Sequence, residues 1–109
     1  MADGGLCSLI HRFITADRTC QGKPVATVVT CRRSGATSAL ATLNSFFAMK
    51  SMPVVTSTYW NLLIGATPAL ARQDTEGLRT MRNLARNMAW LLKCMQAGKR
   101  NGIQNPDLE

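Results

Sequence analysis

Near the start of the chain, apolar residues return at every third or fourth position. They are Leu6, Leu9, Ile10, Phe13 and Ile14, a spacing that places them along one face of an amphipathic helix. We expect this helix to begin near Gly5 and to end before the breaker cluster of residues 21–24, which reads QGKP.

Two short β-branched runs follow. Residues 25–30 are almost continuously apolar, which is typical of a strand covered on both faces in a parallel sheet. Residues 54–58 predict a second strand. Between the runs, Leu40, Leu43, Phe46 and Phe47 repeat at helical spacing. We expect Thr37 or Ser38 to cap this helix. Strand, helix and strand together predict a right-handed βαβ unit.

The last third of the chain predicts a long loop and then the strongest helix. Gly65 and Pro68 interrupt residues 59–73, so we expect no continuous helix there. Asp74 is expected to cap the final helix and Gly98 to end it. Its apolar stripe consists of Leu78, Met81, Leu84, Ala85, Met88, Leu91, Leu92 and Met95.

The expected order is therefore α-β-α-β-α with two parallel strands, and this is an incomplete sheet. Two strands leave unpaired backbone groups at both edges and form a stable parallel layer only with difficulty. We expect a further copy of the chain, giving a homo-oligomer, or a second polypeptide to complete the sheet.

Composition predicts one domain with a preference for anionic partners. The chain has 109 residues, 46% of them hydrophobic, and 13 basic against 6 acidic residues, giving a net charge of +7. A solvated basic surface is the simpler interpretation of this charge. Nucleic acid is an unlikely partner, because no helix-turn-helix or RNA-binding signature is found.

The sequence offers little for catalysis, metal binding or membrane insertion. Its cysteines stand apart and His11 is its only histidine, so we expect no metal site and reduced thiols in a cytoplasmic protein. No apolar run approaches the roughly 18–20 residues that span a membrane. The N-terminus also lacks the basic lead and apolar core of a signal peptide. Asp74 and Glu76 are interpreted as a helix start, and no catalytic side chain is predicted.

Two segments carry a resemblance to a known family. Residues 22–61 (GKPVATVVTCRRSGATSALATLNSFFAMKSMPVVTSTYWN) and residues 74–99 (DTEGLRTMRNLARNMAWLLKCMQAGK) resemble the C-terminal half of the NADPH-dependent FMN reductase family. This family belongs to the flavodoxin-like superfamily and includes relatives of the iron–sulfur flavoproteins. The similarity covers residues 4–103.

The resemblance implies a three-layer α/β fold, of which this chain is a part. Residues 25–30 and 54–58 would be the fourth and fifth strands of a five-stranded parallel sheet. The N-terminal strands, the Ser/Thr-rich phosphate loop and the iron–sulfur cysteines of the family have no counterpart here. We therefore expect residues 1–103 to be the C-terminal half of a flavodoxin-like domain, truncated, and residues 104–109 to be a polar tail.

The resemblance also implies a cofactor site. Ligands of open α/β sheets bind beyond the carboxyl ends of the strands, and the family places FMN there. A glycine lets backbone N–H groups approach the flavin, and a guanidinium stabilises negative charge on a reduced flavin. The implied FMN contacts are Thr30, Cys31, Arg32, Arg33, Ser34, Gly35, Ala36, Tyr59, Trp60 and Asn61. The alternatives are a solvated turn at residues 30–36 and an apolar plug at residues 59–61.

The predicted function is an FMN-binding oxidoreductase of the NAD(P)H-dependent FMN reductase type, with NAD(P)H as co-substrate. Such a protein needs no catalytic side chain, because the cofactors carry the hydride transfer and the protein positions them. The alternative is a non-catalytic remnant or subunit that lacks flavin and acts through association at a strand edge.

Overall fold

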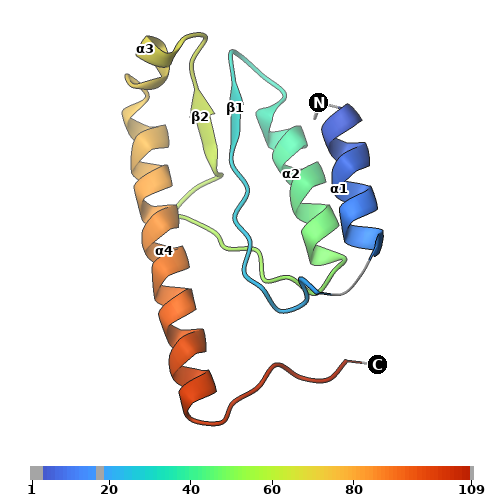
Figure 1. Ribbon diagram of the computed structural model, residues 1–109. Helices are drawn as coiled ribbons and strands as arrows, with labels where there is room; N and C mark the ends of the chain where they lie inside the picture. Colours follow the sequence, from blue (N-terminus) through green and yellow to red (C-terminus); the bar gives the residue numbers. More distant parts are fainter. Residues whose placement is uncertain (1–3, 17–18, 109) are drawn as a thin grey trace.

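The computed structural model describes residues 4–16 and 19–108 and shows an α/β chain with a two-stranded parallel sheet. In chain order its elements are α1 (Gly4–Ala16), β1 (Val29–Cys31), α2 (Ala36–Ala48), β2 (Leu62–Ile64), α3 (Pro68–Ala71) and α4 (Thr75–Arg100) (Figure 1). The α/β class and the two parallel strands are confirmed. The short helix α3 is an addition, within the segment predicted to be a loop.

The elements form layers on the two sides of the strand pair. Helices α1 and α2 lie on one side and α4 lies on the other (Figure 1). Helix α2 packs against β1, and α4 packs against β2. The buried apolar side chains come from α2, α4 and the segment between α2 and β2, and they are Ala36, Ala39, Leu40, Val55 and Leu84.

The strands differ from those that the sequence predicts. The regular pairing is Val29 with Leu62 and Cys31 with Ile64, and an isolated parallel bridge joins Val25 to Val54. The strand predicted over residues 25–30 is therefore paired only at Val25 and again from 29 to 31. The strand predicted over 54–58 is wrong beyond Val54, because regular pairing resumes only in the segment predicted to be a loop.

Hydrogen bonds from α4 explain why residues 55–61 leave the sheet. The amide of Asn87 donates to the Thr56 carbonyl (2.7 Å), and the Ser57 hydroxyl donates to the Thr80 carbonyl (2.7 Å). These bonds give polar groups of residues 55–61 partners outside the sheet. The result is a wide bulge between the Val54 bridge and β2.

Helix α4 begins as predicted and ends later. Asp74 is its N-cap, and one carboxylate oxygen accepts from the Gly77 N–H (2.9 Å). The predicted stop at Gly98 is wrong, since the helix continues to Arg100. Gly102 has a φ of 81°, and the Ile103 N–H donates to the Gly98 carbonyl (2.9 Å). This is a Schellman turn, which needs a left-handed residue after the helix.

Helix α2 also begins differently from the prediction. Gly35, not Thr37 or Ser38, occupies the N-cap position, with a φ of 85° and no side-chain cap. The first helical residue is Ala36.

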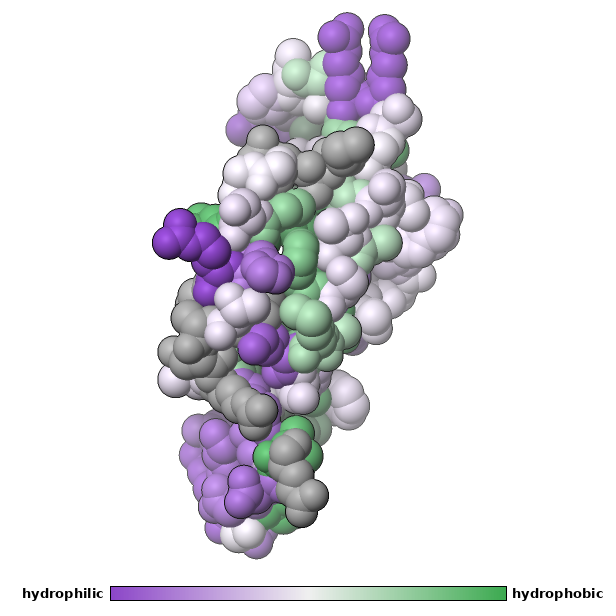
Figure 2. All heavy atoms as spheres, turned by 90° about the vertical axis from the view of Figure 1, so that its right-hand side faces the viewer, coloured by the Kyte–Doolittle hydropathy of each residue, from purple (hydrophilic) through white to green (hydrophobic). Residues whose placement is uncertain are grey.

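Helix α1 is confirmed as a helix, and much of its apolar face stays open. Leu6 is 44% exposed and Leu9 is 64% exposed. Figure 2 looks onto the α1–α2 side and shows apolar atoms at the surface there. The predicted stripe residues Phe13 and Ile14 have side chains outside the described set. Within residues 4–16 and 19–108, no helix combines the length and apolar character that crossing a bilayer requires.

Candidate functional site

The segment between β1 and α2 forms a loop at the carboxyl end of the parallel pair. The Cys31 carbonyl accepts from the Gly65 N–H (3.0 Å), so the loops after β1 and β2 are held side by side. Arg32, Arg33 and Ser34 are exposed, whereas Cys31 is half-buried. The sequence-predicted residues 30–36 therefore share one exposed edge, except that Ala36 is buried beneath it.

The electrostatics of this loop favour an anion. Helix α2 begins directly after Gly35 without a side-chain cap, so its first N–H groups remain available to solvent or to a ligand. Arg32 and Arg33 add two positive charges. No Asp or Glu occurs between Asp17 and Asp74 in the sequence, so the segment carries no carboxylate to neutralise them.

The aromatic part of the predicted site lies elsewhere. Tyr59 and Trp60 precede β2, so they do not follow a strand as the sequence analysis expected. They are 60% and 53% exposed, with ring centroids 5.2 Å apart, so they do not form an apolar plug either. Tyr59 and Trp60 lie before the start of β2, whereas Arg32 and Arg33 lie after the end of β1. Because β1 and β2 are parallel, the aromatic pair and the two arginines are at opposite ends of the sheet.

Asn61 is buried, and its hydrogen bonds connect residues 55–61 to the first strand. Its side-chain amide N–H donates to the Thr27 carbonyl (3.0 Å), and its backbone carbonyl accepts from the Val29 N–H (3.1 Å). Thr27 in turn donates its hydroxyl hydrogen to Asn44 of α2. We interpret Asn61 as a residue that fixes the register rather than one that faces a ligand.

The residues that do follow β2 were missed by the sequence analysis. Gly65 leads from β2 toward α3, and a Cβ there would overlap the backbone of Ala71, so the close approach requires glycine. Thr67 caps α3 by accepting from the Leu70 N–H (3.2 Å). The signal was present in the sequence, because residues 62–64 are an apolar run that ends at a glycine.

Asp74 ties this edge to α4. One carboxylate oxygen accepts from the Ile64 N–H (2.9 Å) and the other from the Gly77 N–H (2.9 Å). The hydrogen bonds from Ile64 and Gly77 hold the pKa of Asp74 below its ordinary value, since they stabilise the ionised form. Asp74 is thus a structural anion rather than an acid–base group.

Other chemistry-bearing residues are dispersed. Among residues 4–16 and 19–108, no three or more His, Cys, Asp and Glu side chains gather as metal ligands would. His11 contacts the edge of the Phe46 ring, with centroids 6.5 Å apart. The charges of Arg32 and Arg33 and the uncapped start of α2 therefore make the loop at residues 30–36 a candidate site for an anion.

No protein-family model, no curated protein and no solved structure matches this chain. A function for the loop at residues 30–36 therefore has to be argued from its residues and from its place in the fold.

Proposed function

We propose that the chain is part of an FMN-binding, flavodoxin-like oxidoreductase of the NAD(P)H-dependent FMN reductase type. In this proposal residues 30–36 lie beside the flavin ring. The observation that supports it is the position of this loop, at the carboxyl end of a parallel strand and directly before an uncapped helix N-terminus. The choice of this family follows only from the resemblance of residues 22–61 and 74–99.

The side chains of the loop would bind and orient the cofactor. Gly35 lacks a Cβ, so the backbone N–H groups around it can approach the flavin ring closely. Arg32 or Arg33 would stabilise negative charge on the reduced flavin. The bound FMN and NAD(P)H would supply the hydride-transfer chemistry.

The proposal includes a further contributor to the site. The 109 residues contain no Ser/Thr-rich loop that follows a strand and could hold the FMN phosphate at a helix N-terminus. We propose that a second polypeptide supplies that wall, because a further copy of these 109 residues would lack the same loop. Residues 30–36 would then form the ring side of a composite site.

Substitution of the two arginines tests the proposal. Arg32→Ala and Arg33→Ala should each weaken FMN binding by about tenfold, or about 1.4 kcal/mol, because each removes a cation beside the ring. Arg100→Ala, an equal loss of charge at the far end of α4, should leave the affinity unchanged. Equal effects of all three substitutions would show that only the net charge matters and would contradict the proposed site.

The second candidate function is association without flavin, and a specific feature of the strands favours it. Ala26 and Val28 make no backbone hydrogen bond to any described part of the chain, since the sheet bonds of this strand come from Val25, Val29 and Cys31. By the alternation of the strand, Thr30 faces the same open edge. On β2, by contrast, the outward Ile64 N–H is already bonded to Asp74.

Amide hydrogen exchange tests this second function. If another strand adds to the open edge, the amides of Ala26, Val28 and Thr30 should exchange more slowly as the protein concentration rises. The Val29 amide, which is bonded to Asn61 within the chain, serves as an internal control. Fast exchange of the three outward amides at every concentration would rule out strand-edge association.

A further inference from the structure

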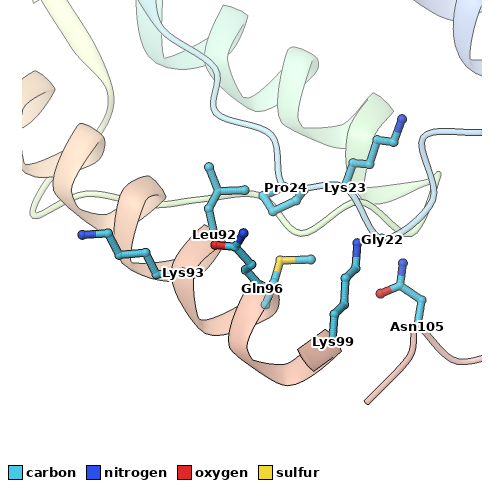
Figure 3. A pocket seen from close by; sticks show the side chains of 9 residues that line it. Gly22, Lys23, Pro24, Leu92, Lys93, Gln96, Lys99 and Asn105 are labelled. Carbon is cyan, nitrogen blue, oxygen red and sulfur yellow. The ribbon is translucent and has the colours of Figure 1, made fainter. Parts of the chain in front are cut away.

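A cavity lies at the end of the molecule opposite the loop that carries Arg32 and Arg33. Its volume is about 580 Å³, within the range of small-molecule sites. It is open to solvent on one side and is bordered by the loop before β1, the last turns of α4 and the C-terminal tail (Figure 3). Its lining residues are Gly22, Lys23, Pro24, Leu92, Lys93, Met95, Gln96, Lys99 and Asn105.

Backbone geometry builds this cavity. The Schellman turn at Gly102 reverses the chain after α4 and directs the tail back toward Gly22. Gly22 has a φ of 76°, and a Cβ there would lie 2.5 Å from the Asn105 amide nitrogen. The Gly22 N–H donates to the Ser51 carbonyl (2.9 Å), so the loop is also fixed to the end of α2. The tail and the loop thus meet at a position where only glycine fits.

The lining divides into an apolar part and a polar part. Pro24, Leu92 and Met95 are the apolar residues of the lining. The amides of Gln96 and Asn105 are its hydrogen-bonding groups. Figure 3 shows Lys99 extending toward Gly22, with the Gln96 amide beside Leu92. A cavity with an apolar wall and a few polar groups is the usual form of a small-molecule site.

The charge of the cavity is positive and unopposed. Lys23 and Lys93 flank it, and in Figure 3 their ammonium groups point outward on opposite sides. Their flexible stems allow these groups to turn toward a bound anion. Within residues 4–16 and 19–108, no carboxylate lines the cavity, and the ammonium groups of its three lysines form no hydrogen bond or ion pair.

The end of α4 does not cancel this charge. A helix C-terminus presents carbonyl groups that repel anions, and lysines are common there for that reason. Here the carbonyls of Ala97, Gly98 and Lys99 accept hydrogen bonds from the turn that follows. Because these carbonyls have backbone partners, the lysine ammonium groups are not needed as their hydrogen-bond donors.

We propose that this cavity binds a small phosphate monoester that carries an apolar group. The apolar group would contact Leu92 and Met95. The phosphate would accept hydrogen bonds from Lys99 and from the Gln96 or Asn105 amide. A phosphate carries up to two negative charges at neutral pH, which matches a site that has several ammonium groups within reach. This site is separate from residues 30–36 and does not depend on flavin binding.

An NMR titration of the whole chain with phenyl phosphate tests the proposal. The amide signals of Gly22, Gln96 and Asn105 should shift and saturate, while those of residues 30–36 should not. Inorganic phosphate, which lacks the apolar group, and benzyl alcohol, which lacks the charge, should each bind at least about tenfold more weakly, a loss of about 1.4 kcal/mol. Inorganic phosphate binding as tightly as phenyl phosphate would overturn the proposal, as would the absence of saturable shifts at the cavity.

Two variants locate the binding. Lys99→Gln should weaken phenyl phosphate binding by at least about tenfold. Arg79→Gln removes the same charge at an exposed position in the first half of α4 and should not weaken binding. Gly22→Ala should also weaken binding, because the added Cβ displaces Asn105. Equal effects of Lys99→Gln and Arg79→Gln would show non-specific attraction and would overturn the site. Loss of FMN binding at residues 30–36 would leave these results unchanged.

Discussion

Asp74 shows how a single side chain can join separate elements. The sequence predicts its role as the N-cap of α4, because an acidic residue precedes a long apolar stripe. Its second hydrogen bond, to the Ile64 N–H, was not predicted, because the apolar run at residues 62–64 was assigned to a loop and the second strand was placed at residues 54–58. One residue thus fixes both the start of α4 and the edge of β2.

Asp74→Ala should destabilise the chain by about 1 to 2 kcal/mol, because it removes an N-cap and leaves two N–H groups without their acceptor. Glu76→Ala is the matched control, since it removes an exposed acid from the first turn of the same helix. Urea unfolding followed by circular dichroism measures both variants. If Asp74→Ala lowers the free energy of unfolding no more than Glu76→Ala does, Asp74 does not connect α4 to β2 as described.

The same carboxylate should make stability depend on pH. Its pKa is lower in the folded chain than in the unfolded chain, so ionised Asp74 stabilises the fold. This contribution is complete above the unfolded pKa of about 3.9 and disappears as the pH falls toward the folded pKa. Asp74→Asn should therefore differ most from the parent near pH 6 and approach it below about pH 4. A stability difference that stays constant between pH 6 and pH 3 would argue against this linkage.

At the scale of elements, the helices were predicted better than the strands. Helical periodicity spans many residues in α2 and α4, so errors at single positions do not change the result. The strands are three residues each, and their pairing depends on which segment α4 draws out of the sheet. The run at residues 54–58 has strand composition, but the polar side chains of α4 bind it after Val54. Local sequence does not contain that interaction.

Asn87→Ala should release part of this bulge. It removes the 2.7 Å bond from the Asn87 amide to the Thr56 carbonyl, a loss of about 0.5 to 1.5 kcal/mol for a typical hydrogen bond. The neighbouring Val55 amide, which is bonded to the Val25 carbonyl, should exchange with solvent faster. Arg82→Ala, at another exposed position of α4, should leave that exchange rate unchanged. The same rate in both variants would show that this bond does not anchor the bulge.

The sequence places some residues of the candidate site correctly and others wrongly, because the end of the second strand was predicted wrongly. The loop after the first strand lies close to where the sequence places it, at residues 32–35, because Thr30 and Cys31 belong to β1 and Ala36 begins α2. Tyr59 and Trp60 were misplaced because the end of the second strand was misplaced. The residues at the carboxyl edge of the sheet can therefore be predicted only where the end of each strand is predicted correctly.

The whole molecule exposes more surface than a compact chain of its size. Its accessible area is 7720 Å², whereas a compact monomer of 11.9 kDa exposes about 6,000 Å². Its radius of gyration is 15.8 Å, compared with about 13 Å for a compact domain of this length. The difference in area, about 1,700 Å² on one chain, is roughly twice the 800 Å² that each partner buries in a standard protein–protein interface. A surface of this size is large enough for the proposed association with a second chain.

Self-association or pairing should therefore stabilise the chain. We expect sedimentation at increasing concentration to give a mass above 11.9 kDa and the melting temperature to rise with concentration. Val28→Lys should weaken association by placing a charge on the open edge, whereas Leu108→Lys in the exposed tail should not. A mass of 11.9 kDa and a constant melting temperature at all concentrations would contradict self-association.

Titration of FMN with the protein, followed by flavin fluorescence and by the amide signals of residues 30–36, shows whether these residues bind FMN. We expect saturable quenching of the flavin together with shifts at Arg32, Arg33 and Gly35, because the loop is proposed to lie against the ring. Constant fluorescence and unshifted loop signals up to about 1 mM FMN, which means binding weaker than about 4.1 kcal/mol, would rule out this site.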